Sequence, residues 1–318
     1  MTTLSLLTPT GELTLGNHLG ALRQMRTTQE TDTCYYGVAD LHALTLPRDP
    51  ATLRTTIRRT QTLLLASGLD ASTLFRQSRV PTHSELAFLL ECTVSTGELN
   101  RMIQFKEKGR GNGSTRASLF TYPALMAADI LLYRPERVPV GADQRQHIEL
   151  TRDLALRFNH EYGQVFTVPE IVLPAAGARV MDLQDPTRKM SKSATELAGV
   201  IRLLDSPEVI RRKVSRAVTD SEVGPDAVRT DREQKPGVTN LLEILAACGG
   251  SAEGITAYGA LKRAVTDAVV AELEPLQRRY AELAASPEHV DAVFEAGAAT
   301  CREVTAPLLA AARAAMGL

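Results

Sequence analysis

The sequence contains no tryptophan, and aromatic residues make up only 4% of its 318 residues. Its four cysteines are far apart, with no CxxC pair and no metal-ligand spacing, so we expect ordinary thiols in a reducing compartment. The N-terminus has no charged region followed by an apolar stretch, and no apolar run approaches the length of a membrane span. These absences predict a cytoplasmic protein without a signal peptide or a membrane anchor.

The net charge and the distribution of apolar runs along the chain indicate the kind of protein further. The net charge of −1 excludes a globally basic chain, so a nucleic acid would have to bind through local patches. Up to residue 184, short apolar runs alternate with helical patterns, whereas after residue 195 strand-like runs vanish and Ala, Glu and Arg dominate. The predicted fold is α/β, with a Rossmann-like doubly wound parallel sheet in residues 1–184. A loop at residues 185–195 and an all-helical domain at residues 196–318 are expected to follow.

Apolar periodicity and turn residues place the individual elements. Strands are predicted at residues 3–8, 34–39, 74–78, 138–141 and 178–181. Helices are predicted at residues 21–28, 49–67, 84–96, 120–133, 143–158, 205–217 and 239–247, and within 255–318. Residues 97–116, rich in glycine and basic side chains, are predicted to be a charged loop, and Asp143 with Gln146 a capping box.

The loop at residues 185–195, DPTRKMSKSAT, carries two lysines three residues apart. Lysine is a flexible point charge with three donors, so Lys189 and Lys192 with Ser191 and Ser193 suit the binding of a polyphosphate. The alternative is a solvated basic turn.

A second candidate phosphate site is PTGELTLGNHLG at residues 9–20, between the first strand and a helix. Gly16 and Gly20 would let a ligand approach the backbone, and the start of the helix offers N–H groups. The segment is neither GxGxxG nor GxxxxGK[ST], and the alternative is a tight connection only.

An acidic residue lies in the mostly apolar stretch 120–133. On a helix, Tyr122, Met126 and Asp129 share one face. A buried carboxylate needs a donor, and an indole N–H can only donate. The alternatives are that Asp129 caps or pairs locally, and that His42, after the second strand, is structural.

The strings KMSKS and PTGELTLGNHLG resemble the two signatures of the class I aminoacyl-tRNA synthetases, the second in its tryptophanyl-tRNA synthetase variant. VADLHA, TYPALMAADILLY and PVGADQRQHIELTRDLALRFN are similar to further segments of that family, so the resemblance covers nearly the whole chain. It implies activation of L-tryptophan by ATP with Mg²⁺, transfer to tRNA(Trp), an anticodon-binding helical domain and a homodimer.

The resemblance also implies residue roles. Thr14 and Asn17 stand in the places of the signature histidines, and with Lys189 and Lys192 they are the expected catalytic residues; no metal ligand is expected from protein side chains. ATP is expected to contact Thr8, Pro9, Thr10, Gly16, Asn17, Gly20, Gly141, Ala142, Asp143, Val180, Lys189, Met190, Ser191, Lys192 and Ser193. Tryptophan is expected to contact His42, Tyr122, Met126, Asp129, Val138, Val140 and Gln144, with Asp129 accepting from the indole N–H.

One departure from the family stands out. The family commonly has Gly-x-Gln-Pro where this chain has Leu6-Leu7-Thr8-Pro9, so the shorter Thr8 is expected to alter ATP affinity and sensitivity to tryptophan-like inhibitors. Three alternatives stay open: a tyrosyl-tRNA synthetase, a paralogue that activates an amino acid without charging tRNA, and a non-catalytic regulator. For the basic face of the helix at residues 205–217, both tRNA contact and simple solvation stay open.

Overall fold

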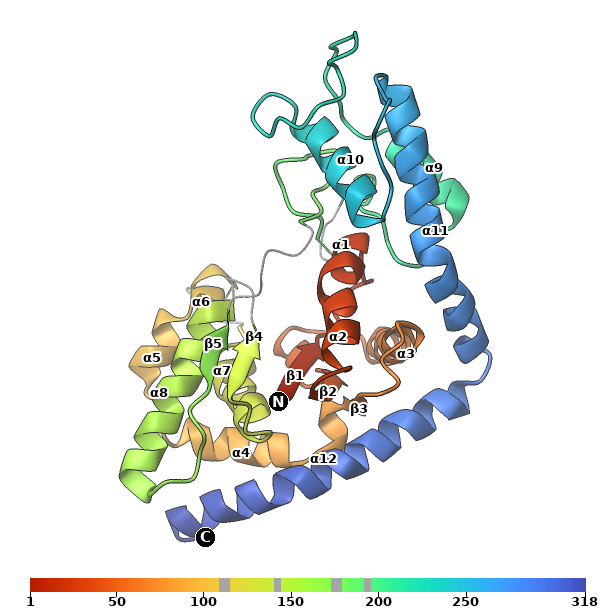
Figure 1. The fold of residues 1–318 in the computed structure, drawn as a ribbon. Helices are drawn as coiled ribbons and strands as arrows, with labels where there is room; N and C mark the ends of the chain where they lie inside the picture. The colour runs from red at the N-terminus through yellow and green to blue at the C-terminus, as the bar shows by residue number, and fades with distance from the viewer. Residues whose placement is uncertain (109–114, 140–143, 173–178, 192–195) are drawn as a thin grey trace.

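Parallel strands form the centre of the N-terminal half. The computed structural model describes residues 1–108, 115–139, 144–172, 179–191 and 196–318. Strands β1 (Thr2–Leu7), β2 (Thr33–Val38) and β3 (Thr73–Arg76) form a parallel sheet with β2 in the middle, and β4 (Arg137–Pro139) pairs in parallel with β5 (Glu170–Val172). Strand β4 lies beside β1 (Figure 1). The predicted parallel α/β fold is confirmed.

Helices separate the strands and make up the C-terminal half. In the N-terminal half they are α1 (Leu15–Asn17), the π-helical η1 (His18–Leu22), α2 (Arg23–Thr28), the 3₁₀ turn η2 (His42–Thr45), α3 (Pro50–Ala66), the 3₁₀ turn η3 (Gln77–Arg79), α4 (Thr82–Glu91), α5 (Thr96–Arg101), α6 (Ile103–Lys108), α7 (Ala117–Leu131) and α8 (Arg145–Tyr162). The C-terminal half contributes α9 (Pro207–Ser215), α10 (Pro236–Ala247), α11 (Tyr258–Ala284) and α12 (Pro287–Met316).

Two of the predicted helix starts follow directly from local sequence. Asp49 caps α3 by accepting from the Thr52 N–H at 2.7 Å, and Pro50 occupies the first turn, where its missing N–H costs nothing. Ser206 caps α9 in the same way, with Pro207 in its first turn. Helix α10 also begins with a proline, Pro236, so this residue starts a helix rather than only interrupting the chain.

The sheet separates two apolar cores, because adjacent strand residues point to opposite faces. Tyr36 and Leu74 pack with α1–α3 and with α9–α11, whereas Tyr35 and Phe75 pack with α4, α7 and α8. Helix α12 contributes to both cores, Phe294 to the first and Cys301 to the second.

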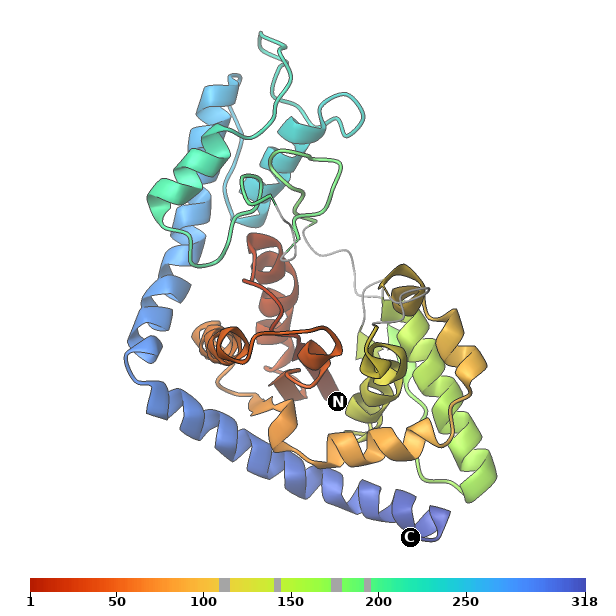
Figure 2. The same cartoon turned by 180° about the vertical axis from the view of Figure 1, so that it is seen from behind.

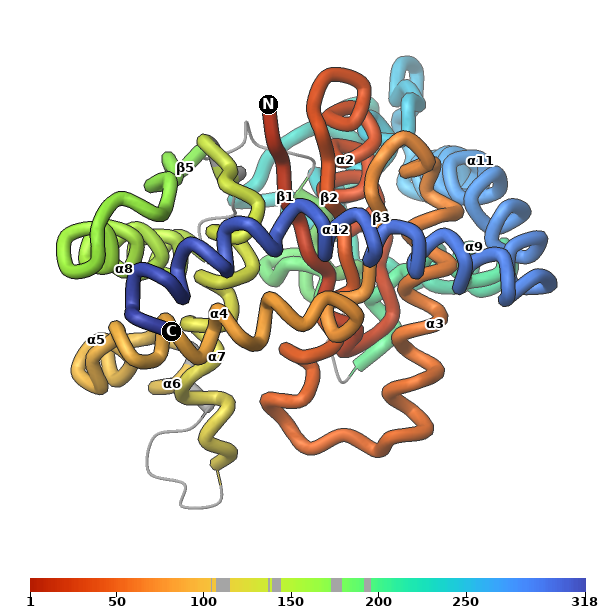
Figure 3. Tube along the Cα trace, turned by 90° about the horizontal axis from the view of Figure 1, so that it is seen from below, coloured from red at the N-terminus to blue at the C-terminus, as the bar shows by residue number. Residues whose placement is uncertain are grey.

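Helix α12 returns from the C-terminal half to the N-terminal sheet, as Figures 2 and 3 show. It packs against β3 and α4, and it approaches β3 so closely at Gly297 that a Cβ there would overlap the carbonyl oxygen of Leu74. The division at residues 184 and 196 stays a prediction, but α12 packs on the sheet that the division would leave in the other domain.

Several predicted elements differ from the structure. Where a loop was predicted at residues 97–116, the structure has α5 and α6, and Ser95 and Glu98 form the capping box that starts α5. Residues 109–114 lie outside the described part. Helix α4 ends at Glu91, and Met181 forms only an isolated antiparallel bridge with Lys189 where a strand was predicted. None of the described helices combines the length and the apolar composition that a membrane span requires.

Candidate active site

The carboxyl ends of β2 and β3 are joined by side chains. Asp40, 6% exposed, accepts from the Ser78 N–H at 2.9 Å and pairs with Arg76 at 3.0 Å. Gln77 is fully buried; its Oε1 accepts from the Leu41 N–H at 3.2 Å and its Nε2 donates to Asp129. These bonds fix the turns that carry His42 and Gln77 at the sheet edge where parallel α/β folds bind ligands.

Asp129 of α7 lies at this edge, 2% exposed, among three donors. Its Oδ1 is 2.7 Å from Gln77 Nε2 and 2.6 Å from His83 Nδ1, and its Oδ2 is 2.7 Å from His42 Nε2. His83 Nε2 lies in turn 2.9 Å from the Tyr133 hydroxyl. Asp129 is thus a buried carboxylate that is held by donors, as the sequence predicts.

The charge state of Asp129 follows from these contacts. Burial alone would raise the pKa of the carboxyl, but the hydrogen bonds and charges of His42 and His83 outweigh it and lower the pKa to about 2. Asp129 is therefore an ionised acceptor at neutral pH. Two carboxylate oxygens offer about four lone-pair sites, so three donors leave room for one more on Oδ2.

Tyr122 of α7 lies beside His42. The ring of Tyr122 stands edge-on to His42 at 6.1 Å, and its hydroxyl is bonded to Nε2 of the buried His147 on α8. Burial raises the pKa of Tyr122, so the hydroxyl stays neutral. Met126, on the same face of α7, and Val138 of β4 belong to the second core. The structure thus brings His42, Tyr122 and Asp129 together, as predicted.

The first signature is tightly folded. The Oδ1 of Asn17 accepts from both the N–H and the hydroxyl of Thr14, at 2.9 and 3.1 Å. Thr14 is 1% exposed, whereas Asn17 is half-buried and keeps its amide N–H groups on the side away from these bonds. Gly16 faces Val180, since a Cβ on Gly16 would stand 3.5 Å from Val180 Cβ. Two predicted ATP residues from distant segments therefore lie side by side.

The second signature begins in an antiparallel turn. Met181 and Lys189 form the bridge, with Met190 N–H donating to Val180 O at 3.0 Å and Asp182 N–H to Arg188 O at 2.9 Å. Met190 is buried and Lys189 is exposed. Six further predicted site residues lie outside the described part of the chain: Val140, Gly141, Ala142, Asp143, Lys192 and Ser193. Thr8, Pro9, Thr10, Gly20 and Ser191 lie within it.

Backbone pairing ties the first signature to the segment that follows the second. Leu15 N–H donates to Ile201 O at 2.9 Å, and Leu203 N–H donates to Leu13 O at 3.0 Å. Glu12 adds ion pairs with Arg59 of α3 and with Arg202, the latter at 2.9 Å. The two signature segments are therefore parts of one structural unit.

Helix α8 starts differently from the prediction. It begins at Arg145 with Gln144 at the cap position, so Gln146 is its second residue and not its third. Asp143, the other member of the predicted capping box, lies outside the described part. Instead, Gln146 bonds across to α6 and α5, accepting from Ile103 N–H at 3.0 Å and donating to Arg101 O at 3.2 Å.

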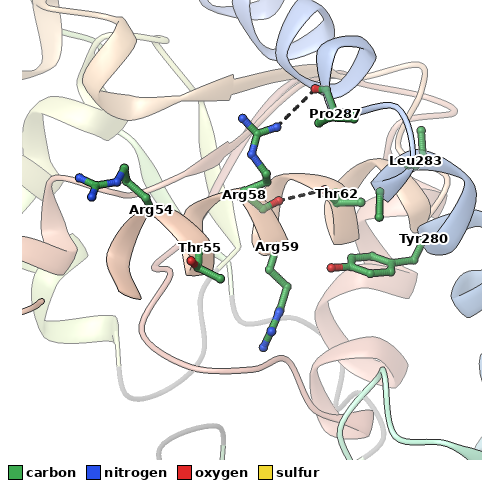
Figure 4. A pocket seen from close by; sticks show the side chains of 9 residues that line it. Arg54, Thr55, Arg58, Arg59, Thr62, Tyr280, Leu283 and Pro287 are labelled. Atoms are coloured by element: carbon green, nitrogen blue, oxygen red, sulfur yellow. Dashed lines mark hydrogen bonds between the residues drawn. The ribbon is translucent and has the colours of Figure 1, made fainter. Parts of the chain in front are cut away.

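A cavity of about 320 Å³ lies elsewhere, between α3 and the junction of α11 and α12. Figure 4 shows its three arginines, Arg54, Arg58 and Arg59, pointing in different directions. Arg58 is paired with Asp291 at 2.9 Å and Arg59 with Glu12. Because these guanidinium groups do not converge and two of them are already paired with carboxylates, the reaction is not assigned to this cavity.

Sequence reasoning missed three members of the site, Gln77, His83 and Tyr133. Their bonds join residues 52, 46 and 50 positions apart. The only sequence signal was that Gln77 and His83 follow the third strand, at the edge where ligands bind.

Known proteins resemble the whole chain. Residues 1–279 match the family model of tRNA synthetases class I (W and Y). The chain is 52% identical over 322 residues to Tryptophan--tRNA ligase 1 of Streptomyces avermitilis, which covers 98% of this chain and 96% of that protein. It is similar to the tryptophanyl-tRNA synthetase structure from Mycoplasma pneumoniae, with a TM-score of 0.89 and 38% identity over 100% of this chain and 98% of that one. For the Campylobacter jejuni tryptophanyl-tRNA synthetase complexed with ADP and tryptophan, the TM-score is 0.88 and the sequence identity is 32%, with 100% of both chains covered.

These matches show that the chain belongs to the class I tRNA synthetases for tryptophan and tyrosine, and within them to the bacterial tryptophanyl-tRNA synthetases. The family membership that the two signatures predict is confirmed.

Proposed function

We propose that this chain activates L-tryptophan with MgATP and transfers it to tRNA(Trp). In the first step the tryptophan carboxylate attacks the α-phosphorus, the bond to the β-phosphate breaks, and tryptophanyl-adenylate and pyrophosphate form. In the second step a hydroxyl of the terminal tRNA ribose attacks the acyl carbon and AMP leaves. The Campylobacter jejuni relative, complexed with ADP and tryptophan, supports the choice of both small substrates.

The observation that carries the specificity is the buried, ionised Asp129. Its Oδ2 faces His42 and, beyond it, the ring of Tyr122, so an indole placed along Tyr122 could donate its N–H to this oxygen. Phenylalanine has no such donor and would leave the fourth lone-pair site of Asp129, on Oδ2, unfilled. For a site built around a substrate donor, such a loss can reach about 10⁴-fold in discrimination. Met126, Val138, Val140 and Gln144 are proposed to complete the pocket.

Catalysis requires no protein nucleophile in this proposal. Positively charged side chains and hydrogen-bond donors that contact the phosphates in the transition state lower the activation barrier. We assign Lys192 and Lys189 to the developing phosphate charge, Asn17 to a phosphate through its free amide N–H groups, and Thr14 to holding Asn17 as well as to the phosphates. The Mg²⁺ ion would enter bound to ATP, as part of the substrate.

A homodimer is also proposed. Phe88 of α4 is 64% exposed, and Ile103 of α6 and Leu156 of α8 are each 53% exposed. The three helices lie on one side of the molecule (Figure 1), where a second copy could cover these apolar side chains. ATP and tRNA as substrates fit a cytoplasmic enzyme.

Measuring adenylation and tRNA charging separately tests this proposal. We expect tryptophan-dependent exchange of labelled pyrophosphate into ATP and charging of tRNA(Trp) by the same preparation. Exchange without charging would identify a paralogue that only activates the amino acid. Binding of tryptophan without exchange would identify a regulator, and either result would overturn the proposal.

A further inference from the structure

One buried side chain outside the site described above holds the start of the second signature. Asn240 of α10 is 2% exposed and meets the backbone of Met181 with both ends of its amide. Its Oδ1 accepts from Met181 N–H at 2.9 Å, and its Nδ2 donates to Met181 O at 3.0 Å. Met181 is the residue that bridges Lys189.

The amide of Asn240 takes the place of a neighbouring strand. In an antiparallel pair, each residue bonds to the partner strand only at alternate positions. Val180 and Asp182 bond toward Met190 and Arg188, so Met181 turns its own N–H and C=O to the opposite side. Met181 is 7% exposed, and buried backbone groups need partners. Asn240 supplies both.

Helix α10 is seated firmly enough to transmit this contact. A Cβ on Gly237, in its first turn, would overlap the carbonyl oxygen of Val218, so the helix and this segment touch backbone to backbone. Val218 N–H in turn donates to Leu183 O at 2.8 Å, two residues beyond Met181. The helix is therefore fixed to the segment 181–183 at two points.

We propose that Asn240 is a positioning residue for adenylation. It holds Met181, and through the bridge it holds Lys189, so that α10 of the C-terminal half sets where the second signature stands over the nucleotide. The inference rests on the proposed function for its kinetic consequence, but the clamp itself is a property of the folded chain. Asn240 touches no substrate in this account.

The test compares Asn240→Ala with a matched clamp elsewhere. Asn159 of α8 holds a backbone turn in the same manner, donating to Phe166 O at 2.8 Å and accepting from Val165 and Phe166 N–H at 3.0 and 2.8 Å. Asn159→Ala removes a similar set of bonds from the turn that follows α8, which packs on the second core and not against Met181. Comparing the two variants at matched folded fraction separates loss of stability from loss of position.

Three readouts are measured on the full chain. For Asn240→Ala we expect kcat of pyrophosphate exchange to fall by about tenfold or more, since part of the charge stabilisation is misplaced. Tryptophan affinity should stay within about twofold, measured from the fluorescence of the bound ligand, because this chain has no tryptophan of its own. Amide hydrogen exchange should accelerate at Met181 and Met190.

The kinetic and amide-exchange results together decide whether Asn240 positions the second signature. The inference is overturned if Asn240→Ala leaves kcat unchanged and the Met181 and Met190 amides still exchange slowly. It is also overturned if kcat falls as much in Asn159→Ala as in Asn240→Ala. If Asn240→Ala does not fold, Asn240→Asp decides by the same criteria, since it keeps the acceptor for Met181 N–H and loses the donor for Met181 O. A wild-type chain without tryptophan-dependent exchange refutes the proposed function alone; the amide-exchange comparison then still tests the clamp.

Discussion

His83 Nδ1 lies 2.6 Å from Asp129 Oδ1, and both side chains are almost completely buried. The opposite ring nitrogen of His83 meets the Tyr133 hydroxyl at 2.9 Å. This pair fixes the carboxylate that we assign to the indole N–H, so His83 should affect tryptophan recognition without touching tryptophan.

Replacing His83 by asparagine or by glutamine separates its contact with Asp129 from its contact with Tyr133. Asparagine places an amide near the position of Nδ1, whereas glutamine places it near Nε2. Glutamine leaves Asp129 Oδ1 with Gln77 alone, so we expect tryptophan affinity to fall by about tenfold in His83→Gln and by only a few-fold in His83→Asn. Titration of bound-tryptophan fluorescence measures both. Equal losses in the two variants would remove the role assigned to the Nδ1 contact.

The pH dependence of stability should report Asp129 directly. Its pKa is lowered from 3.8 to about 2, so its contribution is present above the ordinary value and is lost as pH falls toward 2. We expect Asp129→Asn to cost on the order of 2 kcal/mol of unfolding free energy at neutral pH. In urea unfolding, this difference should shrink as pH falls through that window. The exposed Asp226→Asn is the control, and a difference that is constant with pH would contradict the assignment.

The ion pair between Glu98 and Arg157 ties α5 to α8. Arg157 donates to both carboxylate oxygens of Glu98, at 2.9 and 2.5 Å, and lowers the pKa of that carboxyl to about 2. Glu98→Gln should reduce the free energy of unfolding by about 1–3 kcal/mol, because a charged, partly buried bond is lost. Glu149→Gln, which removes the exposed pair with Arg145, should cost less than about 0.5 kcal/mol. Equal costs would argue against a special role for the pair of Glu98 and Arg157.

The crossing of α12 over β3 should depend on Gly297. Gly297→Ala introduces a methyl group into the Leu74 carbonyl, and we expect a loss of more than about 2 kcal/mol and a lower Tm. Gly259→Ala in α11 is the matched change, since its Cβ would have only the far end of Arg263 nearby, at 3.7 Å. There the usual helix preference should raise stability by up to about 1 kcal/mol. Calorimetry of the two variants compares them directly.

Much of the fold could be predicted from the sequence because the signals are local. Alternating apolar runs located β1, β2 and β3, and Asp49 and Ser206 marked helix starts. The helix α5 could also have been predicted, because Ser95 and Glu98 stand at capping-box spacing. The chemistry required a donor for Asp129, but the choice of His83 and Gln77 depends on contacts across the fold.

Residues 178–181 show why the remainder could not be predicted. A run of this kind after the last helix of the N-terminal half is typical of a strand, but among the described residues 179–181 the β-pairing is limited to a single bridge at Met181. Val180 is buried against Gly16, and the hydrogen bonds of Met181 that another strand would satisfy go to the side chain of Asn240. No local pattern marks an asparagine 59 positions away as that partner.

Pyrophosphate exchange with each of the twenty amino acids tests the central claim most directly. We predict exchange that depends on tryptophan. Phenylalanine should fall below it by orders of magnitude because it has no donor for Asp129. Tyrosine carries a hydroxyl that can donate, so the shape of the pocket must help to exclude it. Exchange supported equally well by tyrosine would contradict the role of Asp129 in specificity, and exchange with no amino acid from folded protein would contradict the proposed reaction itself.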